Sequence, residues 1–133
     1  MPAPTDGLTG NAMLEAVTAA MVALHERYHG RMPLSAKTQL IGDELLACVM
    51  GGVYSDVEKT MIEVQRRGIV RETRSTFQHV MQDRFIAEVE RLTGRRVTSF
   101  MSDSHVGPDI EIELFILAPV EGEPASVAVD PAC

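Results

Sequence analysis

The sequence predicts an α+β fold, a two-layer sandwich in which helices cover one face of a four-stranded, mainly antiparallel sheet. One observation is the order of the periodic segments, which read as α-β-β-α-α-β-β. Another is an internal repeat, since a helix that ends in Gly-Arg and leads into a β-hairpin occurs at residues 30–31 and again at residues 94–95. Hairpins fix each strand pair locally, but the sequence does not say how the two pairs join.

The first repeat begins with an apolar stripe over residues 13–28, where apolar side chains recur at intervals of three and four. This spacing predicts a helix of about 17 residues that starts behind an N-cap at Asn11 and ends at a left-handed Gly30. Residues 37–50 then read as two strands around a two-residue Gly42-Asp43 turn of type II′. The second of these strands is apolar on both faces, so we expect it in the middle of the sheet.

The middle of the chain predicts two consecutive helices. Ser55 and Glu58 form a capping box that starts a short helix over residues 56–66, and Gly68 is expected to interrupt the path. From Ile69 onward an apolar stripe continues for about 24 residues, or roughly 36 Å of helix, which is long for a small domain. Either the first half of this helix packs on a second copy of the chain or the short helix folds back over it. On the strength of that excess length we expect a homodimer.

The second hairpin ends in a strand over residues 110–117, in which isoleucines alternate with Glu111 and Glu113. We expect these carboxylates to face solvent and the strand to lie at an edge or on an open face. Residues 11–119 are thus predicted to form one domain. The Pro-, Gly- and Thr-containing lead at residues 1–10 and the acidic tail at residues 120–133 are expected to be flexible.

The composition disfavours several classes of protein. Twelve basic residues against nineteen acidic ones give a net charge of −7, which argues against nucleic-acid binding because phosphate attraction dominates it. No apolar run of about 18 residues is present, so we expect no transmembrane segment. The N-terminus lacks the features of a secretory signal, and a cytoplasmic location is expected. Without a P-loop, a nucleophile elbow or paired cysteines at metal-binding spacing, no cofactor is expected.

Arginines supply the candidate binding residues. Ten of the twelve basic residues are Arg, whose guanidinium fork suits planar anions such as carboxylate, phosphate or bicarbonate. Arg67, Arg71 and Arg74 share one helical face and could bind an anion or a protein partner, or could form a solvated face. Arg31 and Arg95 follow the two helix-ending glycines, where they could flank one cleft or neutralise the helix ends.

The stretch His25-Glu26-x-x-His29 matches the zinc motif H-E-x-x-H, in which two histidines one turn apart bind the metal and the glutamate activates water. A zinc-dependent hydrolase with His25 and His29 as ligands and Glu26 as base is therefore the alternative function. The motif lies in the last turn of its helix, where histidines also suit the negative end of the helix dipole.

The same residues resemble the MpsC-type domain family over about residues 11–119. The similarity runs through residues 24–52, 53–81 and 89–117. Its more specific elements are the Gly-Arg-Met-Pro step at residues 30–33, Ser55 with Glu58, Arg71 and Arg74, the Gly94-Arg95 step, and Asp103 and Asp109 in the second hairpin.

This family is named after a sodium-translocating, membrane-potential-generating system tied to inorganic-carbon uptake. The resemblance implies a non-enzymatic cytosolic accessory or regulatory domain, with a membrane-transport protein as a possible partner. Where His25 and His29 stand, the family usually has lysine- or tyrosine-like residues, and it has glycine where Met32 stands. The resemblance therefore implies that the H-E-x-x-H match is accidental.

Overall fold

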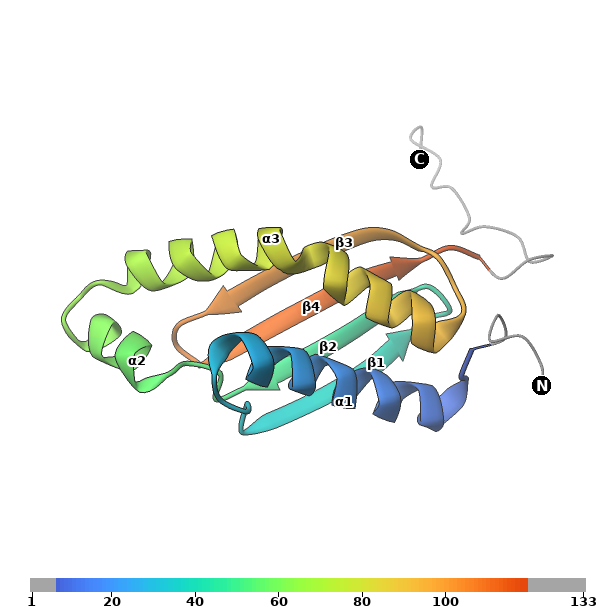
Figure 1. The fold of residues 1–133 in the computed structure, drawn as a ribbon, viewed down its shortest axis with the longest axis horizontal. Coiled ribbons are helices and arrows are strands. Elements are labelled where there is room, and N and C mark those ends of the chain that lie inside the picture. Colours follow the sequence, from blue (N-terminus) through green and yellow to red (C-terminus); the bar gives the residue numbers. More distant parts are fainter. Residues whose placement is uncertain (1–6, 120–133) are drawn as a thin grey trace, which may run out of the picture.

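The computed structural model describes residues 7–119, so the tail at residues 120–133 and the first six residues of the lead lie outside the described part. Seven elements follow in the predicted order (Figure 1). The helices are α1 (Gly10–His29), α2 (Asp56–Glu63) and α3 (Arg67–Thr93), and the strands are β1 (Ser35–Ile41), β2 (Leu45–Gly51), β3 (Val97–His105) and β4 (Ile110–Leu117).

The arrangement confirms the predicted fold class. The four strands form one antiparallel sheet in the order β1-β2-β4-β3, and α1 and α3 lie across one of its faces (Figure 1). The two predicted hairpins form, since β1 pairs with β2 and β3 pairs with β4. Strand β2 also pairs with β4 at the centre of the sheet, so β2 is a central strand as predicted. The two helix–hairpin units are therefore related by an approximate twofold axis through the centre of the sheet and perpendicular to it.

The helix ends follow the local chemistry of the sequence. Gly30 and Gly94 end α1 and α3 with φ angles of 79° and 68°, a left-handed conformation that only glycine adopts at little cost. The predicted capping box of α2 is complete, because Ser55 and Glu58 each accept a hydrogen bond from the backbone amide of the other. The first helix begins two residues earlier than expected, with Thr9 rather than Asn11 at the N-cap.

Two local predictions are wrong. The β1–β2 turn has three residues, 42–44, because Ile41 pairs with Leu45. Gly68 lies within the first turn of α3, and the chain changes direction instead at residues 64–66, where Gln65 has a φ of 65°. Helix α2 folds back beside the first half of α3, which is the second of the two arrangements expected for this long helix.

The prediction for the last strand is wrong in both respects. β4 lies between β2 and β3 rather than at an edge, and Glu111 and Glu113 face the helices with exposed fractions of 2% and 0%. The isoleucines of β4 occupy the opposite face of the sheet. Alternation separates the two faces of a strand, but it does not say which face the helices will cover.

The core lies between the sheet and the two long helices. Its fully buried members come from each layer, with Met21 from α1, Leu46 from β2, Val89 from α3 and Phe115 from β4. Cys48 of β2 is also buried, and burial raises the pKa of its thiol to about 11.

Candidate functional site

Polar side chains gather at the end of the sheet where β2 ends and the β3–β4 hairpin turns. The C-terminus of α1, helix α2 and the first turns of α3 reach the same end, on the left in Figure 1. Segments from both halves of the chain therefore meet at this end of the sheet, although they are not equivalent positions of the two helix–hairpin units.

Arg74 of α3 is at the centre of this end and has only 1% of its surface exposed. Its guanidinium donates two hydrogen bonds to the Glu58 carboxylate (2.6 and 2.8 Å), one to Glu111 (2.8 Å) and one to the Val53 carbonyl (2.7 Å). The guanidinium carbon also lies 4.7 Å from the centre of the Tyr54 ring. The planar fork of arginine allows one side chain to bridge two carboxylates and a carbonyl in this way.

The carboxylates keep Arg74 charged in the interior. Burial alone would lower the pKa of Arg74, but the hydrogen bonds and negative charges of Glu58 and Glu111 raise it above its usual value. Burial alone would likewise raise the pKa of Glu58, but the Arg74 guanidinium lowers it below the usual value. Arg74 and Glu58 are therefore a stable ion pair, and removing either charge would leave the other buried without a partner.

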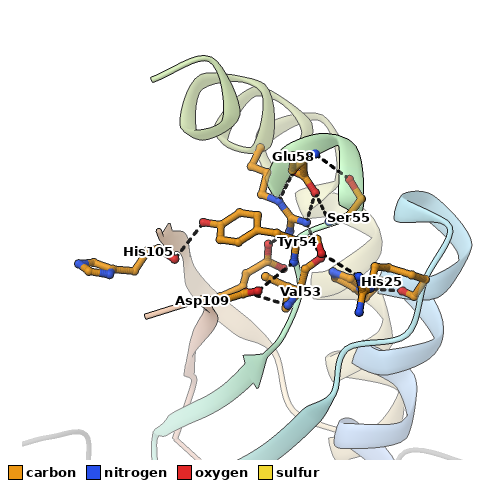
Figure 2. Close-up of polar contacts among 10 residues, drawn as sticks. His25, Val53, Tyr54, Ser55, Glu58, His105 and Asp109 are labelled. Carbon is orange, nitrogen blue, oxygen red and sulfur yellow. Dashed lines mark hydrogen bonds and ion pairs between the residues drawn. The ribbon is translucent and has the colours of Figure 1, made fainter. Parts of the chain in front are cut away.

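The same cluster fixes the connection between β2 and α2. Asp109 in the β3–β4 hairpin accepts hydrogen bonds from the amides of Val53 (2.8 Å) and Tyr54 (3.4 Å). The Tyr54 hydroxyl donates to the His105 carbonyl (3.0 Å), and Arg31 donates to the Tyr54 carbonyl (2.9 Å). The end of α1, the start of α2 and the hairpin are thus tied to one short segment, as Figure 2 shows.

An open cleft adjoins the buried cluster, between the start of α3 and the end of β3. Its volume is about 510 Å³, and its lining includes Ile62, Arg67, Arg71 and residues 103–107. Arg67 and Arg71 are exposed and stand one helical turn apart. In Figure 2 the His105 ring points away from the buried cluster. Helix α3 has neither an acidic residue in its first turn nor a side-chain N-cap, so the positive end of its dipole adds to the charge of the arginines.

The lining of this cleft is positive in a protein that is negative as a whole. Arg67 and Arg71 carry two positive charges, and Asp103 carries one negative charge, against −7 for the entire chain. The Asp103 carboxylate accepts a hydrogen bond from the Ser104 amide (2.8 Å), which holds it near the backbone. We call this site, lined by Arg67, Arg71 and the 103–107 segment, the basic cleft.

The five arginines expected at a binding site take four different places. Arg67 and Arg71 line the basic cleft, and Arg74 lies buried behind it. Arg31 contacts the Tyr54 carbonyl, whereas Arg95 lies at the other end of the sheet and donates to the Ala118 carbonyl (2.8 and 3.2 Å). The approximate twofold axis is perpendicular to the sheet, so it places the two Gly-Arg steps at opposite ends and not around one cleft.

The H-E-x-x-H stretch ends α1 beside the same cluster. His25 is buried, and its Nδ1 donates to the Arg31 carbonyl (2.9 Å), while Glu26 is exposed. The rings of His25 and His29 have their centres 4.6 Å apart. Burial lowers the pKa of both, for His29 to about 4, so both rings are neutral near pH 7. Within residues 7–119, no group of three or more His, Cys, Asp and Glu side chains is placed to hold a metal ion.

Sequence reasoning missed the buried partners of Arg74, above all Tyr54 and Glu111. The sequence does contain a signal that Arg74 is buried. The spacing 70, 74, 78, 81, 85 places Arg74 and Gln78 on the same helical face as Val70, Met81 and Phe85. Two polar residues within an apolar stripe indicate an interior network that must find partners elsewhere in the chain.

These features define a small α+β domain with an interior arginine cluster and an adjoining basic cleft. Residues 9–119, which include all seven elements, match the family model described as "Na+-translocating membrane potential-generating system (MpsC)". The chain belongs to this MpsC family. Comparison with curated proteins and with solved structures gave no match. Among residues 7–119, no helix is both long enough and apolar enough to cross a membrane.

Proposed function

We propose that this chain is a non-enzymatic regulatory domain that binds a small oxyanion in the basic cleft and modulates a membrane transport system from the cytoplasmic side. The family description, which names a Na+-translocating system, supports the association with membrane transport. The resemblance to a system tied to inorganic-carbon uptake makes bicarbonate the first oxyanion to test. The protein partner in this proposal is a component of that transport system.

The observation that carries the proposal is the convergence of Arg67 and Arg71 with the 103–107 segment around one cleft. Two guanidinium groups one turn apart offer parallel N–H donors to the oxygens of a carboxylate, bicarbonate or phosphate. The positive end of α3 favours the same ligands. The volume of about 510 Å³ lies within the usual range of small-molecule sites.

The contacts around the cleft offer a route by which an anion would act on a partner. The 103–107 segment lines the cleft, and the carbonyl of His105 accepts the hydrogen bond of the Tyr54 hydroxyl. Tyr54 in turn stacks on Arg74, which holds Glu58 at the start of α2. An anion that draws Arg71 and the hairpin together would therefore change these contacts, which position α2. The outer surface of α2 includes the exposed Val57.

Thermal unfolding in the presence of anions tests the proposal. A ligand that binds only the folded state raises the unfolding midpoint in proportion to the logarithm of its concentration over its Kd. We expect bicarbonate or phosphate to give a saturable rise relative to sodium chloride at equal ionic strength. Arg71→Ala should abolish this rise, and Arg67→Ala should weaken it. Arg96→Ala is the matched control, because Arg96 is exposed and follows α3 at the opposite end.

Two results would contradict anion binding in the cleft. One is the absence of a saturable rise with any of the oxyanions. The other is an equal loss in Arg71→Ala and Arg96→Ala, which would show a general effect of net charge. The partner is tested separately, by asking whether membrane transport proteins are retained by the wild-type chain and released by the effective anion.

A further inference from the structure

The sheet has a second face that neither α1 nor α3 covers. Both helices lie on the near side of the sheet in Figure 1, and alternate residues of all four strands form the far side. Three of these residues, Ile41, Met101 and Val49, are 58%, 54% and 38% exposed. The apolar residues of this face, which we call the open face, are Ile41, Leu45, Ala47, Val49, Met101, Ile110, Ile112, Leu114 and Ile116.

The open face is large enough to be an interface. Its strands have seven to nine residues, so with about 3.3 Å per residue and about 4.8 Å between strands it measures roughly 20 by 23 Å. The flat area is therefore roughly 460 Å², and the largest apolar patch on a typical monomer, about 300–600 Å², is often functional. A protein interface of standard size buries about 800 Å² of accessible surface per partner, so the flat area alone is about half of that value.

In the described part of the chain, the charged side chains of the open face belong to its two edge strands. Lys37 of β1 pairs in register with Val49, Val49 with Ile112, and Ile112 with Asp103 of β3, so these four residues form one row across the sheet. Lys37 and Asp103 are both exposed, and their neighbours Thr38 and Ser104 are buried on the helix side. The row is thus basic at one edge, apolar in the middle and acidic at the other edge.

This pattern is complementary to itself. A twofold axis parallel to the strands, between two sheets placed face to face, exchanges the β1 edge with the β3 edge but keeps each row at the same height. Lys37 of one copy then faces Asp103 of the other, and the contact occurs twice. A twofold axis across the strands would instead place β1 edges over one another and would bring no opposite charges together.

We propose that the open face is the interface of a homodimer in which two sheets pack face to face about an axis parallel to the strands. Side chains of the two sheets interdigitate about 10 Å apart, with the strands aligned within roughly 30°. The apolar centre supplies the affinity, and the Lys37–Asp103 pairs at the rim set the orientation. Asp103, on the edge strand β3, borders both the open face and the basic cleft, whereas Arg67 and Arg71 belong to α3 in the helix layer and stay accessible in this dimer. The inference does not depend on anion binding.

The mass of the protein in solution is the first test. Sedimentation equilibrium should give twice the 14.5-kDa chain mass at micromolar concentration. Val49→Lys, which places a charge in the centre of the open face, should convert the protein to a monomer while its far-ultraviolet circular dichroism is retained. Val80→Lys is the matched control on the outer side of α3, where Val80 is 70% exposed, and should leave the dimer intact. A wild-type monomer at hundreds of micromolar would overturn the proposal and leave the face for a different partner.

A charge exchange tests the orientation. Lys37→Glu and Asp103→Lys each place like charges opposite one another in two symmetric contacts, and each should raise the dimer Kd by about tenfold. The double variant Lys37→Glu/Asp103→Lys restores opposite charges and should return the Kd to within about twofold of wild type. Additive weakening in the double variant, or a dimer that survives Val49→Lys, would place the interface elsewhere.

Discussion

Glu111 and Glu113 lie two residues apart on β4 and face the same helices, yet their surroundings are opposite. Glu111 accepts a hydrogen bond from the buried Arg74 at 2.8 Å. Among residues 7–119, neither carboxylate oxygen of Glu113 has a hydrogen-bond partner, and the neighbours of Glu113 across the strands are Cys48 and Ser102. Burial, and then the nearby charge of Glu111, raise the pKa of Glu113 well above its usual range.

The difference shows that one cation determines the role of each carboxylate. An ionised group in the interior is stable only where an opposite charge or several donors meet it. Arg74 reaches Glu111 but not Glu113, so Glu111 is an ion-pair partner and Glu113 is a protonated acid over a wide range of pH. Equal burial and the same residue type therefore give two different functions on one strand.

Removing the cation should have the largest effect. Arg74→Ala leaves Glu58 and Glu111 without their shared partner, and we expect the free energy of unfolding to fall by about 3–5 kcal/mol in urea titrations. The exposed Arg91, which pairs with Glu88 on the surface of α3, provides the matched control. Arg91→Ala should cost no more than about 0.5 kcal/mol.

A second variant keeps this prediction open to test if Arg74→Ala does not fold. Arg74→Leu combined with Glu111→Leu replaces one buried ion pair with apolar side chains, and we expect it to be more stable than Arg74→Leu alone. If Arg74→Ala lowers the free energy of unfolding no more than Arg91→Ala does, the cluster does not stabilise the fold. Arg74 would then not explain why Glu111 and Glu113 differ.

The glutamates themselves should respond to pH with opposite consequences. Because the folded pKa of Glu113 is raised, the folded state keeps a proton that the unfolded chain releases above about pH 4.5, so stability is lost as pH rises toward the folded pKa. The slope is at most about 1.4 kcal/mol per pH unit. Glu113→Gln cannot ionise, and we expect it to match wild type near pH 5 and to be more stable by about 1 kcal/mol or more at pH 8.

Glu111→Gln is the matched comparison on the same strand. It removes the anionic partner of Arg74, so we expect a loss of about 1–3 kcal/mol at pH 8. Chemical unfolding of both variants at pH 5 and pH 8 measures the difference. Effects of the same sign at pH 8 would show that Glu113 is not protonated in the folded protein.

Much of the fold could be predicted because its determinants are local. Helical periodicity, the glycines at 30 and 94 and the capping box at Ser55 each depend on residues within a few positions of one another. The central place of β2 followed from a strand that is apolar on both faces. The junction between β2 and β4 could not be read in this way, because it pairs strands from the two halves of the chain.

The site was predictable only where its residues are close in the sequence. Arg67 and Arg71 were expected at one surface from their spacing, and they do line one cleft. Arg74 shares that spacing, but its burial depends on Glu111, 37 residues further along the chain. The alternation of β4 was likewise compatible with either face being covered by the helices. The acidic face is the inner one because the buried Arg74, whose burial was not predicted, pairs with Glu111 there.

The free energy of unfolding at acid pH should depend on His29 rather than on Glu113, and we expect this effect to be smaller than the effects above. Burial first, and then Arg74 and His25, lower the pKa of His29 to about 4, below its unfolded value of 6.5. The unfolded chain therefore binds a proton that the folded state lacks, and stability is lost as pH falls from about 6.5 toward 4. With allowance for the partial exposure of the ring, His29→Gln should lose roughly 1 kcal/mol less than wild type between pH 7 and pH 5. His79→Gln, an exposed histidine on α3, should follow wild type. If His29→Gln also follows wild type, the loss of stability at acid pH comes from other groups. If stability falls less at acid pH in His29→Gln and less at alkaline pH in Glu113→Gln, the two losses are assigned to two buried neutral residues of the same interior.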